Sequence, residues 1–241
     1  MLKYFTYQLV ENLKEIPSEG VIGETTVINC LNPHSFMMAT RDSDFSEALR
    51  QSNYLLPDGE GICMTMRWFS SRKIGKIAGD DLHRFLLAKT EAAKGRVFYM
   101  GSSEMVLQRI ASRIRQEYPN IEVQTLSPSF CDQLPEAESL SIVETINGFR
   151  PDVLFVSMTA PKQEKWLHRY KGALKGVGVA AGIGAVFDFY AGTVKRAPAW
   201  AVRMKLEWLV RLLKEPRRMW RRNMVSTPQF LWWVFRHRKE I

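Results

Sequence analysis

The chain has 241 residues, 46% of them hydrophobic and 24% charged, which is enough for one sizeable core but short for two full domains. Its net charge is +9, yet residues 195–241 hold thirteen Lys or Arg and three Glu, so residues 1–194 are close to neutral. The N-terminus lacks the apolar core of a signal peptide, and no apolar run matches a bilayer-spanning helix, so we expect a cytoplasmic protein.

Residues 1–194 are predicted to form an α/β Rossmann-like domain, because short β-branched runs alternate with amphipathic stretches from residue 21 onward. This pattern is typical of a mostly parallel sheet flanked by helices. The predicted strands are 26–30, 53–56, 96–100, 121–125, 153–158 and 177–181. The predicted helices are 46–52, 81–93, 103–118, 136–148 and 162–170.

Polar residues follow the first two predicted strands, where an open α/β sheet binds its ligands. Asn32 precedes a proline that can open a helix, so it is either an N-cap or a group that binds sugar hydroxyls. Asp58 is followed by Gly59 and Gly61, which would let a substrate approach the main chain. Asp58 is a candidate general base, and a tight turn with an exposed carboxylate is the alternative.

The next two turns contain candidate phosphate contacts. Lys76 could meet a phosphate, and Gly79 leads into a predicted helix for which Asp80 or Asp81 is a cap. The Gly101, Ser102 and Ser103 turn opens another helix after an apolar strand, an arrangement whose free N–H groups attract phosphate. We include Gly79, Asp81 and the 101–103 turn among the candidate substrate-binding residues.

Two later turns complete the candidate site. Gln163 and Glu164 fall in the first turn of a predicted helix, where acidic residues are ordinary, but Gln163 can also point back toward the strand ends. Asp188 lies between two phenylalanines after a glycine-rich turn. An unpaired buried carboxylate is costly, so Asp188 either pairs with an arginine, caps a helix or binds substrate.

The last 47 residues differ from the rest in charge and in tryptophan content. Residues 199–214 have helical spacing, Pro216 should interrupt the helix, and residues 217–241 combine arginines with the apolar run 230–235. Basic residues and tryptophan suit an anionic membrane surface, whereas tryptophan at helical spacing is also typical of a core. We therefore predict that 195–241 is a basic helical appendage that meets a membrane. Its tryptophans are Trp200, Trp208, Trp220, Trp232 and Trp233.

No metal site is expected. The sequence Asp42-Ser43-Asp44 mimics a metal-binding Asp-x-Asp motif, but it precedes a predicted helix and capping explains it. The four histidines show no metal-ligand spacing.

Five blocks in this order resemble the WecG/TagA/CpsF family of bacterial glycosyltransferases. The blocks cover most of the chain between residues 26 and 222. They are Leu56-Pro57-Asp58-Gly59-x-Gly61, Ala78-Gly79-Asp80-Asp81-Leu82, Ala160-Pro161-Lys162-Gln163-Glu164, Phe187-Asp188-x-x-Ala191-Gly192-x-x-Lys195-Arg196-Ala197-Pro198, and Leu206-Glu207-Trp208-x-x-Arg211-Leu212.

The resemblance implies a Rossmann-like fold and an inverting transfer from a nucleotide sugar with no metal or other cofactor. The implied donor is UDP-N-acetylmannosamine or a relative, and the implied acceptor is a sugar on undecaprenyl diphosphate. Asp58 matches the proposed catalytic base of the family. Asn32, Gln163 and Asp188 match positions of its donor pocket, and the 101–103 turn lies near the nucleotide.

The chain departs from the family pattern at three places. Cys30 replaces a common threonine, Lys76 replaces an arginine, and Pro128-Ser129-Phe130 replaces a Gly-Tyr-Phe sequence. These changes concern the donor sugar and its base and leave the reaction class intact.

The tail is expected to act in two parts, at the inner face of the cell membrane. Its first half would close the active site over the diphosphate, and the remainder would hold the lipid surface. The candidate arginines for these contacts are Arg196, Arg211, Arg217 and Arg218.

Two other functions are compatible with parts of this sequence. A basic nucleic-acid-binding α/β protein is the main alternative, although the α/β domain is neutral and no recognised nucleic-acid motif is present. A nicotinamide dehydrogenase lacks its Gly-x-Gly-x-x-Gly fingerprint. We therefore expect a sugar-nucleotide donor, a lipid-linked acceptor and a membrane surface as partners, and no nucleic acid; the oligomeric state stays open.

Overall fold

The computed structural model describes residues 7, 9–17, 24–69, 74–195, 198, 201, 203–204 and 207–238. A sheet of six parallel strands forms its centre, in the spatial order β2-β1-β6-β5-β3-β4. The predicted Rossmann-like α/β fold is therefore confirmed. The strands are β1 Thr26–Leu31, β2 Tyr54–Pro57, β3 Arg96–Gly101, β4 Glu122–Leu126, β5 Val153–Ser157 and β6 Val179–Gly182.

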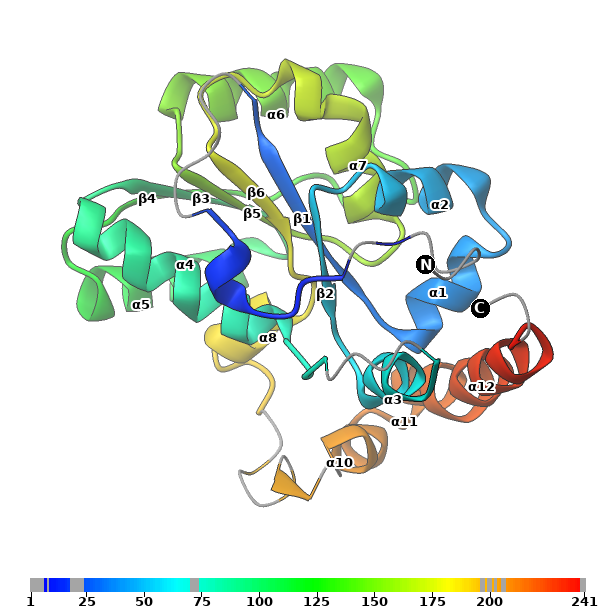
Figure 1. The fold of residues 1–241 in the computed structure, drawn as a ribbon. Coiled ribbons are helices and arrows are strands. Elements are labelled where there is room, and N and C mark those ends of the chain that lie inside the picture. Colours follow the sequence, from blue (N-terminus) through cyan, green and yellow to red (C-terminus); the bar gives the residue numbers. More distant parts are fainter. Residues whose placement is uncertain are drawn as a thin grey trace.

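Helices cover both faces of this sheet (Figure 1). The α6 and α7 helices pack on one face, α4, α5 and α8 pack on the other, and α2 packs beside α7. The α-helices of this part are α1 Pro33–Ala39, α2 Ser43–Arg50, α3 Glu60–Phe69, α4 Gly79–Ala93, α5 Glu104–Glu117, α6 Glu136–Phe149, α7 Lys162–Tyr170 and α8 Val186–Tyr190. Two 3-10 helices, Leu13–Glu15 and Lys171–Ala173, complete it.

Residues alternate between the two faces along each central strand, as the pleat of a strand requires. On β3, Val97 and Tyr99 face the α4 and α5 side, whereas Phe98 and Met100 face the α6 and α7 side, and all four are fully buried. A parallel sheet with helices on both sides favours apolar residues at most positions of its central strands. The near-continuous apolar runs in the sequence are thus explained.

The list of predicted helices lacks α1, α3 and α8, although the proline after Asn32 indicated that a helix could open there. All three directly follow strand-end turns, so the sequence pattern merges them with the turns. The α2 helix also begins three residues earlier than predicted, because the Asp42 side chain accepts a hydrogen bond from the Phe45 N–H at 3.0 Å and caps it. This capping confirms the interpretation of the Asp42-Ser43-Asp44 sequence.

The tail forms a row of helices next to α3 and α1 (Figure 1). The α10 helix Glu207–Lys214 ends just before Pro216 and α11 Pro216–Trp220 begins at it, so the predicted interruption is confirmed. A π-helix, Arg221–Ser226, then leads into α12 Thr227–Arg236. Among the described residues, every helix is too short or too polar to cross a membrane.

One face of α12 belongs to the protein core. Phe230 and Val234 are buried in a cluster with Leu31 and Ile62. The Phe230 ring meets the Phe36 ring of α1 edge-on, with centroids 5.2 Å apart. The opposite face carries Trp232 and Phe235, which are 65% and 54% exposed.

Replacing Phe230 with alanine should lower the free energy of unfolding by about 3–5 kcal/mol, because it removes a fully buried ring from this cluster. Trp232→Ala is the matched control on the same helix, and it should change the stability by less than about 0.5 kcal/mol. Urea denaturation measures both. Equal effects of the two substitutions would contradict the packing of α12.

Candidate active site

A cleft of 2480 Å³ lies at the carboxyl ends of the strands. Residues at or just after the ends of all six strands line it, and residues of the tail line it as well. In open α/β sheets this edge is where ligands bind. Of the candidate residues, those that line the cleft are Asn32, Asp58, Gly59, Gly61, Lys76, Gly79, Asp81, Ser102, Ser103, Gln163, Glu164 and Asp188.

Asn32 is the N-cap of α1. Its Oδ1 accepts hydrogen bonds from the His34 and Ser35 N–H groups, both at 3.0 Å. The capping interpretation is therefore confirmed for this oxygen. Since Asn32 also lines the cleft, its amide Nδ2 is the group through which it could contact a ligand.

The Asp58 turn is fixed directly to the end of β1. The Asp58 N–H donates to the Leu31 carbonyl at 2.9 Å, which places Asp58 beside Asn32. Gly59 has a φ of +135°, which residues with a Cβ rarely adopt, and a Cβ on Gly61 would lie 2.8 Å from Pro33 Cγ. The glycines thus allow the sharp turn and the close packing of α3 on α1, which leaves the Asp58 carboxylate half-buried at the cleft.

The start of α4 forms a neighbouring part of the wall. The Asp81 side chain accepts from the Ala78 N–H at 2.9 Å, so the predicted capping by one of the two aspartates falls to Asp81. Asp80 pairs with Arg84 at 3.1 Å. Gly79 is buried, and a Cβ there would lie 3.2 Å from Val186, so this glycine lets α4 pack on α8. Lys76 is half-buried at the cleft.

The β3–α5 turn differs in one respect from the prediction. Gly101 does not line the cleft, because it is buried against Ser157, whose carbonyl a Cβ at this position would overlap. Ser102 adopts a left-handed conformation with φ 59°. Ser103 is the N-cap of the 14-residue α5, and its side chain makes no capping hydrogen bond. With no capping side chain from Ser103, the first N–H groups of α5 can therefore meet a ligand at the cleft, as far as the described residues show.

The first turn of α7 contains two residues that are nearly fully buried, Gln163 and Glu164. Gln163 Nε2 donates to Glu164 Oε1 at 3.0 Å, and Gln163 Oε1 accepts from the Met158 N–H at 3.3 Å. Glu164 Oε2 is buried and has no hydrogen-bond partner among the described residues. Burial raises the pKa of Glu164 to about 7, and its hydrogen bonds oppose that rise only in part.

Asp188 lies in the short α8, half-buried at the cleft. Its backbone carbonyl accepts from the N–H groups of Thr193 and Val194 at 3.1 and 3.2 Å, which folds the following segment back. Asp188 thus lines the cleft at the point where the chain turns back after α8.

The tail contributes a cation that sequence reasoning did not select. Arg222 lines the cleft from the π-helix, and its charge lowers the pKa of Cys30, although burial, Asp58 and Glu164 raise that pKa well above its usual value. Cys30, Asp58, Glu164 and Arg222 come from separate parts of the chain and line the same cleft. The run of arginines at 217–222 was a signal for a phosphate contact, but it did not indicate which member reaches the cleft.

A contact between α1 and the tail holds the π-helix in place. His34 Nδ1 lies 2.8 Å from Ser226 Oγ, and burial together with the charges of Arg222 and Arg221 lowers the pKa of His34. A neutral imidazole can share this hydrogen bond without repelling the arginines.

The other predicted tail contacts are not described. Arg196 lies outside the described residues, as do the side chains of Arg211, Arg217 and Arg218. Within the part of the chain that is described, no group of three or more His, Cys, Asp or Glu side chains could hold a metal ion.

Comparison with known proteins gives consistent results. The model of the glycosyl transferase WecG/TagA/CpsF family matches residues 5–241. The N-acetylglucosaminyldiphosphoundecaprenol N-acetyl-beta-D-mannosaminyltransferase of Bacillus subtilis (strain 168) is 36% identical over 213 residues, 88% of this chain and 80% of that protein. The proteins of the same name from Bacillus spizizenii and Staphylococcus aureus (strain MW2) are 34% and 27% identical, over 86% and 97% of this chain and 78% and 89% of those proteins.

The raised pKa of Glu164 predicts a pH-dependent stability. Its pKa is about 7 in the folded protein and about 4.5 when unfolded, so the folded state binds more protons between these values and loses stability as the pH rises. Glu164→Gln should abolish this loss, so its stability relative to the unsubstituted protein should rise by about 3 kcal/mol across the interval.

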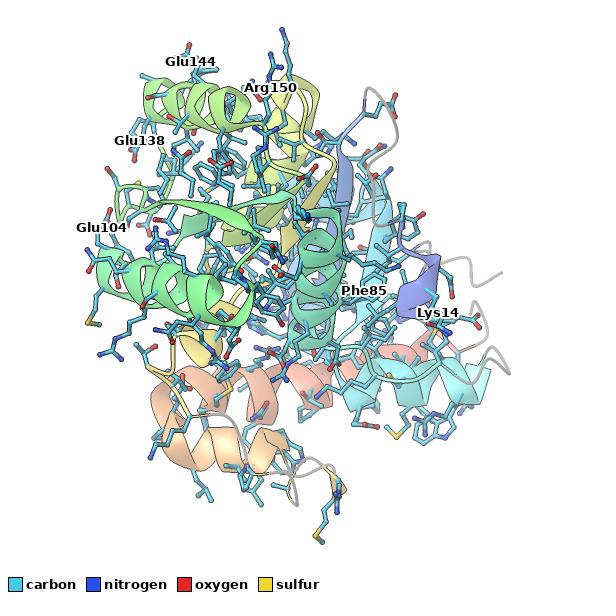
Figure 2. The ribbon with its side chains drawn as sticks, turned by 90° about the vertical axis from the view of Figure 1, so that its left-hand side faces the viewer. Lys14, Phe85, Glu104, Glu138, Glu144 and Arg150 are labelled. Carbon is cyan, nitrogen blue, oxygen red and sulfur yellow. The ribbon has the colours of Figure 1, made fainter. Side chains whose placement is uncertain are left out.

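Urea denaturation at several pH values measures the effect. Glu144→Gln is the control, because Glu144 is exposed on α6 (Figure 2). A constant stability difference between Glu164→Gln and the unsubstituted protein across this range would contradict the raised pKa.

Proposed function

Because this chain belongs to the WecG/TagA/CpsF family of glycosyltransferases, we propose that it transfers an N-acetylmannosamine-type sugar from a nucleoside diphosphate to a sugar on a polyprenyl diphosphate. The observation that carries this proposal is the family match over almost the whole chain, combined with a cleft at the strand ends. The relatives' names specify a mannosaminyl donor group and an undecaprenol-linked acceptor. UDP is the proposed nucleotide, and bacterial surface polysaccharide is the proposed product.

The proposed reaction is a direct displacement with inversion. The acceptor hydroxyl gives its proton to the Asp58 carboxylate and attacks the anomeric carbon, and the nucleoside diphosphate leaves with the electrons of the broken bond. The β-configured product in the relatives' names supports inversion, because hexoses in UDP donors are ordinarily α-linked. The location of Asp58 beside Asn32, in a turn shaped by glycines, supports its role as base.

Charge on the leaving diphosphate needs positive partners. The cleft is lined by Lys76, by Arg222 and by the N–H groups at the start of α5. These groups are proposed to stabilise the negative charge on the diphosphate. This set supports a reaction that needs no metal ion, since each partner is part of the chain. Arg222 is thus proposed to contact the diphosphate, the role that the sequence suggested for other arginines of the tail.

The tail is proposed to bring the enzyme to a membrane surface, where a lipid-linked acceptor would lie. Its exposed apolar side chains include Trp208, Trp220, Trp232 and Phe235, which are 44–65% exposed among many arginines. Aromatic and basic side chains together suit an anionic lipid interface. The family match includes this basic tail, which weakens the nucleic-acid alternative.

Asp58→Asn should lower kcat by about 100-fold or more, because asparagine cannot accept the acceptor's proton. The Kd for UDP should stay within about twofold, as the substitution preserves shape. The control is Asp44→Asn, an exposed carboxylate at the same cleft, which should leave transfer unchanged. Transfer onto a lipid-linked acceptor analogue measures both variants, and near-normal turnover of Asp58→Asn would remove Asp58 from the proposed role.

The double substitution Trp232→Ser and Phe235→Ser should weaken binding to anionic vesicles by about tenfold, because it removes exposed apolar area without touching the buried face of α12. Leu140→Ser is the control: Leu140 is 47% exposed on α6, at the end of the molecule away from the tail helices (Figures 1 and 2). Vesicle co-sedimentation is the measurement. Unchanged binding of the double variant would argue against a membrane role for this face.

A further inference from the structure

Gln163 is held in one orientation from two sides at the floor of the cleft. A backbone N–H can only donate, so the Met158 N–H requires the oxygen of the Gln163 amide to face it, at 3.3 Å. The Glu164 carboxyl oxygen accepts from the amide nitrogen at 3.0 Å. The two contacts therefore agree on a single placement of oxygen and nitrogen in the Gln163 side chain.

The end of β6 leaves room for this amide. A Cβ on Gly182 would lie 3.1 Å from Gln163 Nε2 and would overlap Asn29 Oδ1. Gly182 also lines the cleft, so the amide lies against bare backbone at the strand end. Nε2 carries two hydrogens, and Glu164 is its only hydrogen-bond partner among the described residues. One N–H of a cleft-lining amide is thus left for a ligand.

The burial of Glu164 is unusual for an acidic residue in the first turn of a helix. Acidic residues there normally face water, but Glu164 is 2% exposed, and no ion pair to it occurs among the described residues. Burying a carboxyl is costly unless both oxygens are hydrogen-bonded or paired, and Glu164 Oε2 has no such partner among the described residues. Its raised pKa, about 7 because of burial, means that the neutral form is readily populated, and a neutral carboxyl still accepts a hydrogen bond from Gln163.

We propose that Glu164 is a positioning residue that fixes the Gln163 amide, so that its remaining N–H group recognises a hydrogen-bond acceptor on the donor sugar. The carbonyl oxygen of an N-acetyl group is the acceptor that fits this geometry, since it is a strong acceptor that projects from the ring. The site then favours N-acetylated sugars over their plain hydroxyl counterparts. This assignment rests on the proposed glycosyltransferase function.

Three substitutions of Glu164 distinguish a role in positioning the Gln163 amide from a role in the stability of the fold. Glu164→Gln keeps an oxygen that can accept from Gln163, Glu164→Leu removes the acceptor at similar volume, and Glu164→Asp withdraws the carboxyl by one methylene. The ligands are UDP, UDP-mannose and UDP-N-acetylmannosamine, with affinities measured by calorimetry and KM and kcat measured by transfer.

Glu164→Leu and Glu164→Asp should each weaken UDP-N-acetylmannosamine binding by about tenfold, because one hydrogen bond to the sugar loses its fixed donor. Their affinity for UDP should stay within about twofold, which also shows that they are folded. Glu164→Gln should restore the affinity for UDP-N-acetylmannosamine to within about threefold of the unsubstituted protein. The preference over UDP-mannose should fall in Glu164→Leu and Glu164→Asp, where the acceptor oxygen is removed or withdrawn, and should persist in Glu164→Gln.

Several results would overturn the assignment. If Glu164→Leu and Glu164→Asp keep the full preference for the N-acetylated donor, Glu164 does not position Gln163. If Glu164→Gln binds as poorly as Glu164→Leu, the acceptor oxygen is not what matters. If the unsubstituted protein binds no nucleotide sugar, the proposed function fails together with the assignment, whereas the first two results leave the proposed function standing.

Discussion

The parallel direction of all six strands is the constraint on which the rest of the structure depends. Because the strands run the same way, every strand-to-helix turn emerges at one edge of the sheet, and the cleft lies there. The end of β1 and the turn after β2 are joined by the hydrogen bond from the Asp58 N–H to the Leu31 carbonyl. Groups separated by more than a hundred residues, such as Asp58 and Glu164, act on the same thiol of Cys30 for the same reason.

Polar residues at this edge can stabilise the fold or bind a ligand, and most of them make a contact that stabilises the fold. Asn32 and Asp81 cap helices, and the glycines of the Asp58 turn permit close packing. Glu164 is different, because it is buried with an oxygen that no described residue satisfies. A fold tolerates such a group where it serves binding, since burial alone would favour an apolar side chain.

The tail joins the core and the surface through the two faces of α12. Phe230 is completely buried against Phe36, whereas Trp232, two residues later and on the opposite face of the helix, is mostly exposed. The π-helix before it brings Arg222 to the cleft, and the His34–Ser226 contact holds it there. Some side chains of this one helix therefore pack in the core, whereas others lie on the surface.

The sequence by itself determined the fold class and the order of the strands along the chain, and most of the candidate residues that it named at strand-end turns line the cleft, because apolar periodicity and strand-end turns are local properties. It also indicated the helix break at Pro216. Only the tertiary structure decided that Gly101 packs against Ser157, that Arg222 reaches the cleft, and that Glu164 is buried. These depend on how distant segments pack, since burial is a property of neighbours that sequence spacing does not specify.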